Sequence, residues 1–95
     1  MNKAQDYLKG RLIELVEKFK DIRLEYSFEE EYNDHIVEVT PSVMFEDNEF
    51  NDHEMEIIKD FYDKFPDHTA MFTYSGLLKD MEGIDIIVIR GILYK

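Results

Sequence analysis

The sequence contains no cysteine. This absence excludes disulfide bonds and thiolate metal ligands within the chain. Long hydrophobic runs are missing too, because no stretch approaches the roughly 18 consecutive apolar residues of a membrane-spanning helix. The first residues alternate between charged and apolar types, which is not the pattern of a signal peptide. We therefore expect a cytoplasmic protein.

Positive charge is missing from one long segment. Residues 24–58 hold twelve Asp and Glu but no Lys or Arg, and the net charge of the whole chain is −11. Nearly all the excess negative charge thus lies in this segment. Nucleic acid and anionic membranes are poor partners for such a chain, since phosphate binding needs clustered cations. A basic protein surface suits it better.

What the chain does contain is enough to build one hydrophobic core. Of its 95 residues, 44% are hydrophobic, and these include seven Phe and six Tyr. A chain of this length can bury one modest core without disulfides or metals, and its composition is not typical of disorder. We expect a single α+β domain that spans residues 1–95.

The spacing of apolar residues predicts the elements of this domain. Apolar residues recur every three or four positions over residues 3–20 and again from about Asp47–Asn51 to Phe65, which predicts two helices. Alternating or apolar runs predict strands at 22–28, 35–40, 69–75 and 84–90. The order is α-β-β-α-β-β, which favours a two-layer fold with a four-stranded sheet and two helices on one face. The connection through the second helix should be a right-handed crossover, and residues 43–45 are a candidate extension of the second strand.

The same patterns predict which side chains form the core. The expected buried positions come from both helices and from three strands. They are Leu12, Val16, Phe19, Leu24, Tyr26, Val37, Val39, Ile58, Phe61, Ile86 and Val88.

The three histidines each follow an aspartate, and Asn-Asp-His occurs twice. In the predicted topology, His53 begins a helix and His68 follows its end, which separates them by roughly 20 Å at 1.5 Å per residue. Three histidine ligands therefore cannot converge, and we interpret these residues as turn and helix-start residues. A looser metal site made by His35 and His68 is the alternative. We predict no metal site and no cofactor.

Other motifs that carry chemistry fail at their diagnostic positions. A calcium loop that begins at Asp47 would place Asp52 where glycine is required and Ile58 where a bidentate glutamate is required. The dipeptide His53-Glu54 starts a zinc-protease motif, but Ile57 stands in place of the second histidine. No serine lies in a glycine elbow. The sequence therefore predicts a protein that is not an enzyme.

Two short strings resemble a known group of proteins. HIVEVTP at residues 35–41 and DFYDKFP at residues 60–66 resemble short, acidic bacterial proteins of unassigned function, over about residues 12–78. In that group a hairpin strand ending in VTP precedes an acid-rich helix. The resemblance implies a bacterial or phage origin and an α+β fold, and it transfers no catalytic residue.

These observations favour a non-catalytic interaction module. Such a module could be an inhibitor, an immunity or antitoxin-like protein, or a DNA mimic, each presenting an acidic surface from residues 24–58 to a basic partner. The residues expected to form this surface are Glu29, Glu30, Glu31, Asp34, Glu46, Asp47, Glu49 and Asp52. A solvated face that only keeps the protein in solution is the simpler explanation of the same charges.

Two further functions remain open from the sequence. The first is a homo-oligomer, such as a homodimer, that associates through its sheet, because the strand at 84–90 is apolar on both faces and could leave Ile87 and Ile89 partly open. The second is a small enzyme of unknown reaction, which would need a deep pocket lined by perturbed carboxylates.

Overall fold

The two helices form where the apolar spacing predicts them. The structure, a computed structural model, describes residues 3–19, 21–74 and 85–90. Helix α1 (Lys3–Lys18) buries Ala4, Leu8 and Leu12 on one face, at the four-residue spacing that brings side chains together on a helix. Helix α2 (Asn48–Lys64) buries Phe50, Ile57 and Phe61 in the same way. Among the described residues, no helix has the length and apolar character needed to cross a membrane.

The first two strands form an antiparallel hairpin. Strand β1 (Arg23–Glu29) pairs with β2 (Asp34–Thr40) in a register that sets Tyr26 opposite Val37. Asn33 adopts a positive φ of 54° in the connecting turn, a conformation that asparagine tolerates better than most residues. The interpretation of the first Asn-Asp-His as turn residues therefore holds for Asn33, whereas Asp34 already belongs to β2.

The segment after Pro41 is a short helix and not an extended strand. A 3₁₀-helix, η1 (Ser42–Glu46), occupies residues 43–45, so the prediction of a strand extension is wrong. Proline has no N–H to continue the ladder, and the Pro41 carbonyl instead accepts a bond from the Met44 N–H at 3.2 Å. Asp47 then caps α2, because its side chain accepts a hydrogen bond from the Phe50 N–H.

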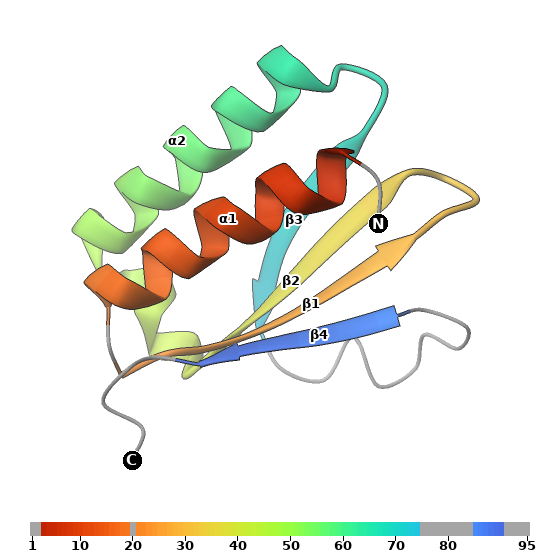
Figure 1. The fold of residues 1–95 in the computed structure, drawn as a ribbon. Helices are drawn as coiled ribbons and strands as arrows, with labels where there is room; N and C mark the ends of the chain where they lie inside the picture. The colour runs from red at the N-terminus through yellow and green to blue at the C-terminus, as the bar shows by residue number, and fades with distance from the viewer. Residues whose placement is uncertain (1–2, 20, 75–84, 91–95) are drawn as a thin grey trace.

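Strand β3 (Thr69–Tyr74) returns beside β2 and runs parallel to it. This arrangement follows from the crossover through α2, which carries the chain back to the starting end of β2. Figure 1 shows both helices lying over the same face of the sheet. Strand β4 (Asp85–Arg90) pairs antiparallel with the other side of β1, so the strand order is β3-β2-β1-β4.

The fold class expected from the sequence needs a correction. The sequence predicted one four-stranded sheet, whereas the sheet whose side chains can be described is a mixed three-stranded one, β3-β2-β1. For strand β4 the structure describes only the backbone and its pairing with β1, and not the side chains. The α+β character holds, with two helices on a mixed sheet.

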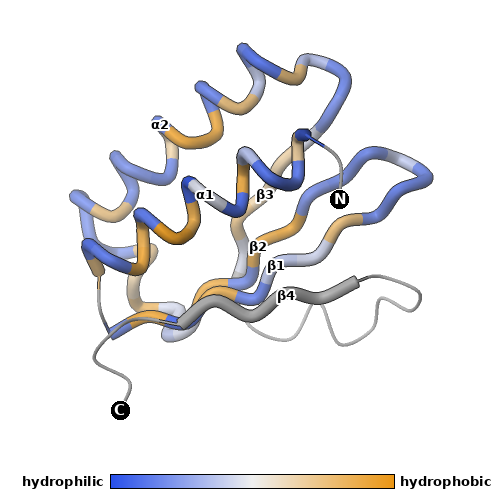
Figure 2. The backbone as a smooth tube through the Cα atoms, in the orientation of Figure 1, coloured by the Kyte–Doolittle hydropathy of each residue, from blue (hydrophilic) through white to orange (hydrophobic). Residues whose placement is uncertain are grey.

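The core lies between the helices and this sheet. Figure 2 shows hydrophobic residues where α1 and α2 approach the strands and hydrophilic residues along their outer sides. Seven predicted core residues are buried: Leu12, Val16, Leu24, Tyr26, Val37, Val39 and Phe61. Phe19 and Ile58 are half-buried and pack against the same cluster. The other two, Ile86 and Val88, lie in β4, outside the described side chains.

The central strands are also buried on the face away from the helices. Ser27 is 1% exposed and Glu38 is 3% exposed, although alternation along a strand directs both away from the helices. The related proposal that Ile87 and Ile89 are partly open concerns side chains that the structure does not describe.

Candidate functional site

The hairpin-tip acids form one of two separate groups of predicted site residues. Glu29 ends β1 and is half-buried, while Glu30 and Glu31 are exposed in the turn. Asp34 begins β2, where its carboxylate accepts a hydrogen bond from the Thr69 hydroxyl. Asp34 therefore ties the tip to β3 and is less available to a partner than its neighbours.

The helix-start acids form the second group, and all four are exposed. Glu46 ends η1 and Asp47 caps α2. Glu49 lies in the first turn, where its carboxylate is 3.4 Å from the Lys18 Nζ of α1. Asp52 lies on the next turn. Acids in these positions stabilise the helix, since they complement the positive end of its dipole.

The two groups lie at opposite ends of the molecule. Strand β2 starts at the hairpin tip and leads away from it, and α2 begins at the far end (Figure 1). The seven residues of β2 alone span roughly 20 Å at about 3.3 Å per residue. The eight predicted residues therefore form two surfaces and not one.

The helix-start acids continue into a longer surface that the sequence reasoning missed. Glu49 and Asp52 are followed on the same side of α2 by Glu56, Asp60 and Asp63, at the three- and four-residue spacing of one helix face. Glu49, Asp52, Glu56 and Asp63 are exposed and Asp60 is half-buried. We call these five residues the α2 acidic row. The three- and four-residue spacing of these carboxylates predicts the row. The acidic segment was defined by the absence of Lys and Arg, so it ends before Lys59 and leaves out Asp60 and Asp63.

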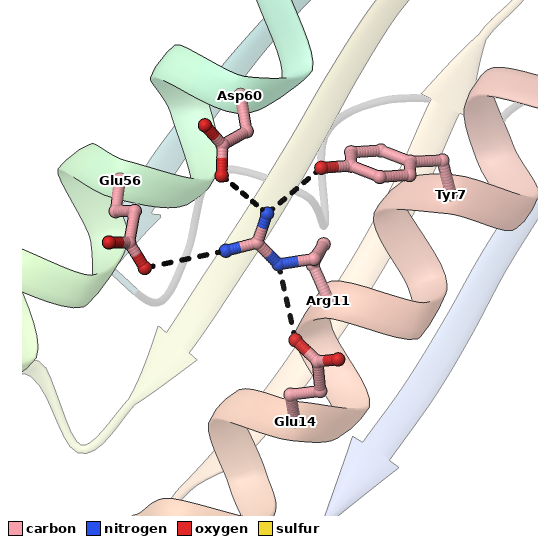
Figure 3. A network of polar contacts seen from close by, with 5 residues as sticks. All are labelled: Tyr7, Arg11, Glu14, Glu56 and Asp60. Atoms are coloured by element: carbon pink, nitrogen blue, oxygen red, sulfur yellow. Dashed lines mark hydrogen bonds and ion pairs between the residues drawn. The ribbon is translucent and has the colours of Figure 1, made fainter. Parts of the chain in front are cut away.

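Arg11 of α1 holds the inner side of this row (Figure 3). Its guanidinium lies 2.8 Å from Asp60, 3.6 Å from Glu56 and 3.2 Å from Glu14, and it donates to the Tyr7 hydroxyl at 2.9 Å. The hydrogen bond to Asp60 raises the pKa of Arg11 above its ordinary value. One cation thus joins the two helices and partly neutralises the row.

Beyond the contacts of Arg11, the α2 acidic row has few counter-charges. Lys18 reaches Glu49, and no other ion pair to the row besides those of Arg11 occurs within the described residues. A cavity of about 220 Å³ lies between the helices and is bordered by Arg11, His53 and Glu56. Its volume is below the roughly 300–1,000 Å³ typical of small-molecule sites. The row is therefore better suited to surface contact than to enclosing a substrate.

Replacement of Arg11 should show how much this network stabilises the helix pair. We expect Arg11→Met to lower the free energy of unfolding by about 1–2 kcal/mol, more than an exposed ion pair contributes, because the guanidinium is mostly covered and has several partners. Urea denaturation at low and high salt measures this difference, which should shrink as salt rises. Lys18→Met is the matched control, and an equal loss in both variants would contradict a special role for Arg11.

One of the three histidines is placed differently from the prediction, while His53 lies near the start of α2 and His68 follows its end. His35 is not a turn residue, because it lies inside β2 and is 1% exposed. Its Nδ1 is 2.6 Å from the Tyr26 hydroxyl, and its Nε2 is 2.8 Å from Nδ1 of His68. His35 and His68 are thus joined by a hydrogen bond between their ring nitrogens. His53 instead packs edge-on against Phe19.

The histidine pair sits among aromatic rings. The ring of Phe28 is centred 4.5 Å from that of His35, and the Phe61 ring is centred 4.9 Å from it. Burial lowers the pKa of His35 from its ordinary value of 6.5 to about 4, and the charge of His68 adds to this effect. Burial also raises the pKa of Tyr26. No group of three or more ligating side chains suited to a metal occurs among residues 3–19, 21–74 and 85–90.

Comparison with protein-family models, curated proteins and solved structures finds no match for this chain.

Proposed function

We propose that the protein is a non-catalytic interaction module that presents the α2 acidic row to a basic partner. The observation that carries this proposal is the continuity of five carboxylates on one side of a single helix. From Glu49 to Asp63 the row extends about 21 Å at 1.5 Å per residue. A surface of this kind attracts a basic protein and speeds its association.

The charge density of the row bears on the type of partner. Five carboxylates over about 21 Å amount to roughly one charge every 5 Å, whereas a single DNA strand carries one phosphate per 3.4 Å. The row is thus less dense than the phosphates that a DNA mimic would copy. This comparison favours an inhibitor, immunity or antitoxin-like role toward a basic protein over mimicry of DNA. We place this role in the cytoplasm, and the bacterial or phage origin stays a prediction.

Two charge-matched variants test the proposal. The row variant carries Glu49→Gln, Asp52→Asn and Asp63→Asn, which leaves the Arg11 contacts to Glu56 and Asp60 intact. The tip variant carries Glu29→Gln, Glu30→Gln and Glu31→Gln, so each variant loses three negative charges. We expect the tip variant to melt at a higher temperature than the wild type at low salt, because like charges are removed. The row variant should gain less, because it also loses the contact of Glu49 with Lys18 and the favourable interaction of its acids with the helix dipole.

Only the row variant should weaken capture of the native partner from extracts of the source organism. The loss should shrink as salt rises, because salt screens exposed charges. Quantitative mass spectrometry of captured proteins at low and high salt measures it. Equal losses in the two variants would indicate attraction by net charge alone, and no loss in either would indicate a merely solvated surface; each result would contradict the proposal.

A further inference from the structure

Strand β3 carries an open edge in addition to the acidic row. Among the described strands it is the last on its side of the sheet, with β2 as its neighbour. Edge strands expose backbone N–H and C=O groups that can pair with another chain, and natural proteins usually guard them with charged residues or proline. Strand β3 has neither, since its sequence is Thr-Ala-Met-Phe-Thr-Tyr.

The hydrogen bonds of β3 show which backbone groups face outward. The Thr69 N–H donates to the Asn33 carbonyl, on the side of β2. The next residue, Ala70, faces the other way, and the Tyr62 hydroxyl lies 3.2 Å from both its N–H and its C=O. Because neighbouring residues of a strand direct these groups to opposite edges, Phe72 follows Ala70 outward. Tyr62 thus covers the edge at Ala70, whereas no hydrogen bond from a described residue is found at the outward groups of Phe72, a residue that is 8% exposed as a whole.

A groove adjoins the uncovered part of this edge. It has a volume of about 430 Å³ and lies between η1 and β3, bordered by Ser42, Phe45, Glu46, Phe72 and Thr73. Two aromatic rings make it largely apolar, and the exposed carboxylate of Glu46 lies beside them. A peptide strand added to β3 would direct alternate side chains toward this groove.

The charges of the molecule indicate what can dock there. A second copy of this chain would bring another net charge of −11 against the first and would be repelled. A cationic segment would instead be attracted, and a Lys or Arg of that segment could pair with Glu46. Main-chain hydrogen bonds supply affinity in such strand additions, and the pockets beside the strand supply specificity.

We infer that the outer edge of β3 at Phe72, together with the adjoining groove, binds an extended cationic segment of a partner protein by strand addition. The segment carries an apolar side chain for the groove and a basic side chain for Glu46. That the segment is cationic rests on the proposed function. That it binds by strand addition rests on the edge of β3 and on the groove beside η1.

A synthetic hexapeptide Lys-Thr-Val-Thr-Lys-Thr, blocked at both ends, is a suitable probe, because it places valine and lysine on the same face of the strand. We expect NMR titration to show saturable binding and slower hydrogen exchange of the Phe72 amide. The control is a peptide of the same sequence that is N-methylated at the alternate residues whose N–H groups face β3. It keeps its charge but cannot donate these backbone hydrogen bonds. It should bind about tenfold more weakly. Equal binding of the two peptides, or binding without protection of Phe72, overturns the inference.

Two variants locate the contact. Ser42→Trp places a large side chain in the groove from an exposed position and should abolish protection of Phe72. Tyr32→Trp, at the exposed hairpin tip, is the matched control and should leave binding unchanged. If Ser42→Trp binds the peptide as the wild type does, the inference is wrong. The same holds if sedimentation shows a dimer that protects Phe72 without peptide, because the edge would then be occupied by a second copy.

The outcomes also separate this inference from the proposed function. Peptide binding that is lost in the row variant and never protects Phe72 would leave the acidic row as the contact surface and remove β3 from it. Conversely, protection of Phe72 together with unchanged partner capture by the row variant would support the strand addition and contradict the proposed role of the row.

Discussion

Replacing Phe61 with alanine is expected to lower the free energy of unfolding by about 3–5 kcal/mol. The side chain is fully buried in the last turn of α2 and packs against the rings of Tyr7, Phe65 and His35. Its removal loses the transfer free energy of the ring and leaves a cavity that the surrounding helices and strands cannot fill. A domain of 95 residues has a total stability of only roughly 5–14 kcal/mol. The variant should therefore unfold at a much lower urea concentration.

A second consequence follows from the position of Phe61 against the histidine pair. With the ring absent, water can approach His35, so its pKa should rise from about 4 toward its ordinary value of 6.5. Met55→Ala is the matched control, because Met55 is on the same helix but 68% exposed. Its effect should stay within about 0.5 kcal/mol. If Phe61→Ala melts within a few degrees of wild type, the packing described for this face of α2 is wrong.

The stability of the wild type is expected to fall as pH decreases from about 6.5 to about 4. His35 takes up a proton with a pKa of about 4 in the folded state and 6.5 in the unfolded state. Between these values the unfolded chain binds more protons, so acid favours unfolding. The contribution of His35 is fully present above about pH 6.5 and is lost on acidification to about pH 4. At 1.36 kcal/mol per pKa unit, the loss is at most about 3 kcal/mol.

A comparison with His35→Gln isolates this contribution from that of the carboxylates. Burial raises the pKa of Glu54, which acts in the opposite sense, because it favours the protonated folded state as pH falls. That contribution is common to both proteins and cancels in the difference between them. Urea denaturation at several pH values measures the difference, and NMR titration of the wild-type His35 ring provides a reading that does not depend on the variant folding. A His35 ring that titrates near pH 6.5 in the folded protein would contradict the prediction.

The elements of the fold were largely predictable, because their signals are local. The helices have apolar residues every three or four positions, Asp47 can cap α2 through its own side chain, and Asn33 accepts the positive φ of the hairpin turn. Seven of the named core residues are buried for the same reason, since periodicity assigns them to one face. The prediction of a strand extension after Pro41 was wrong, because a segment of five residues can form either a 3₁₀-helix or an extended strand, and its sequence does not decide between them.

The candidate site was less predictable, because its parts come from distant positions. The composition showed that residues 24–58 are acidic, but it did not show that the tip and the start of α2 point to opposite ends. The row from Glu49 to Asp63 has a helical period that is visible in the sequence, whereas the reach of Arg11 to Asp60 depends on how two helices pack.

By itself, then, the sequence determined the two helices, the first hairpin, the apolar face of each element and the strong excess of negative charge. Each follows from a residue's own chemistry or from neighbours a few positions away. Only the tertiary structure decided that His35 pairs with His68 rather than serving as a turn residue, and that β3 lies parallel to β2 at the edge of the described strands. These features join residues more than 30 positions apart. Such contacts depend on how whole elements dock, and no local pattern encodes that.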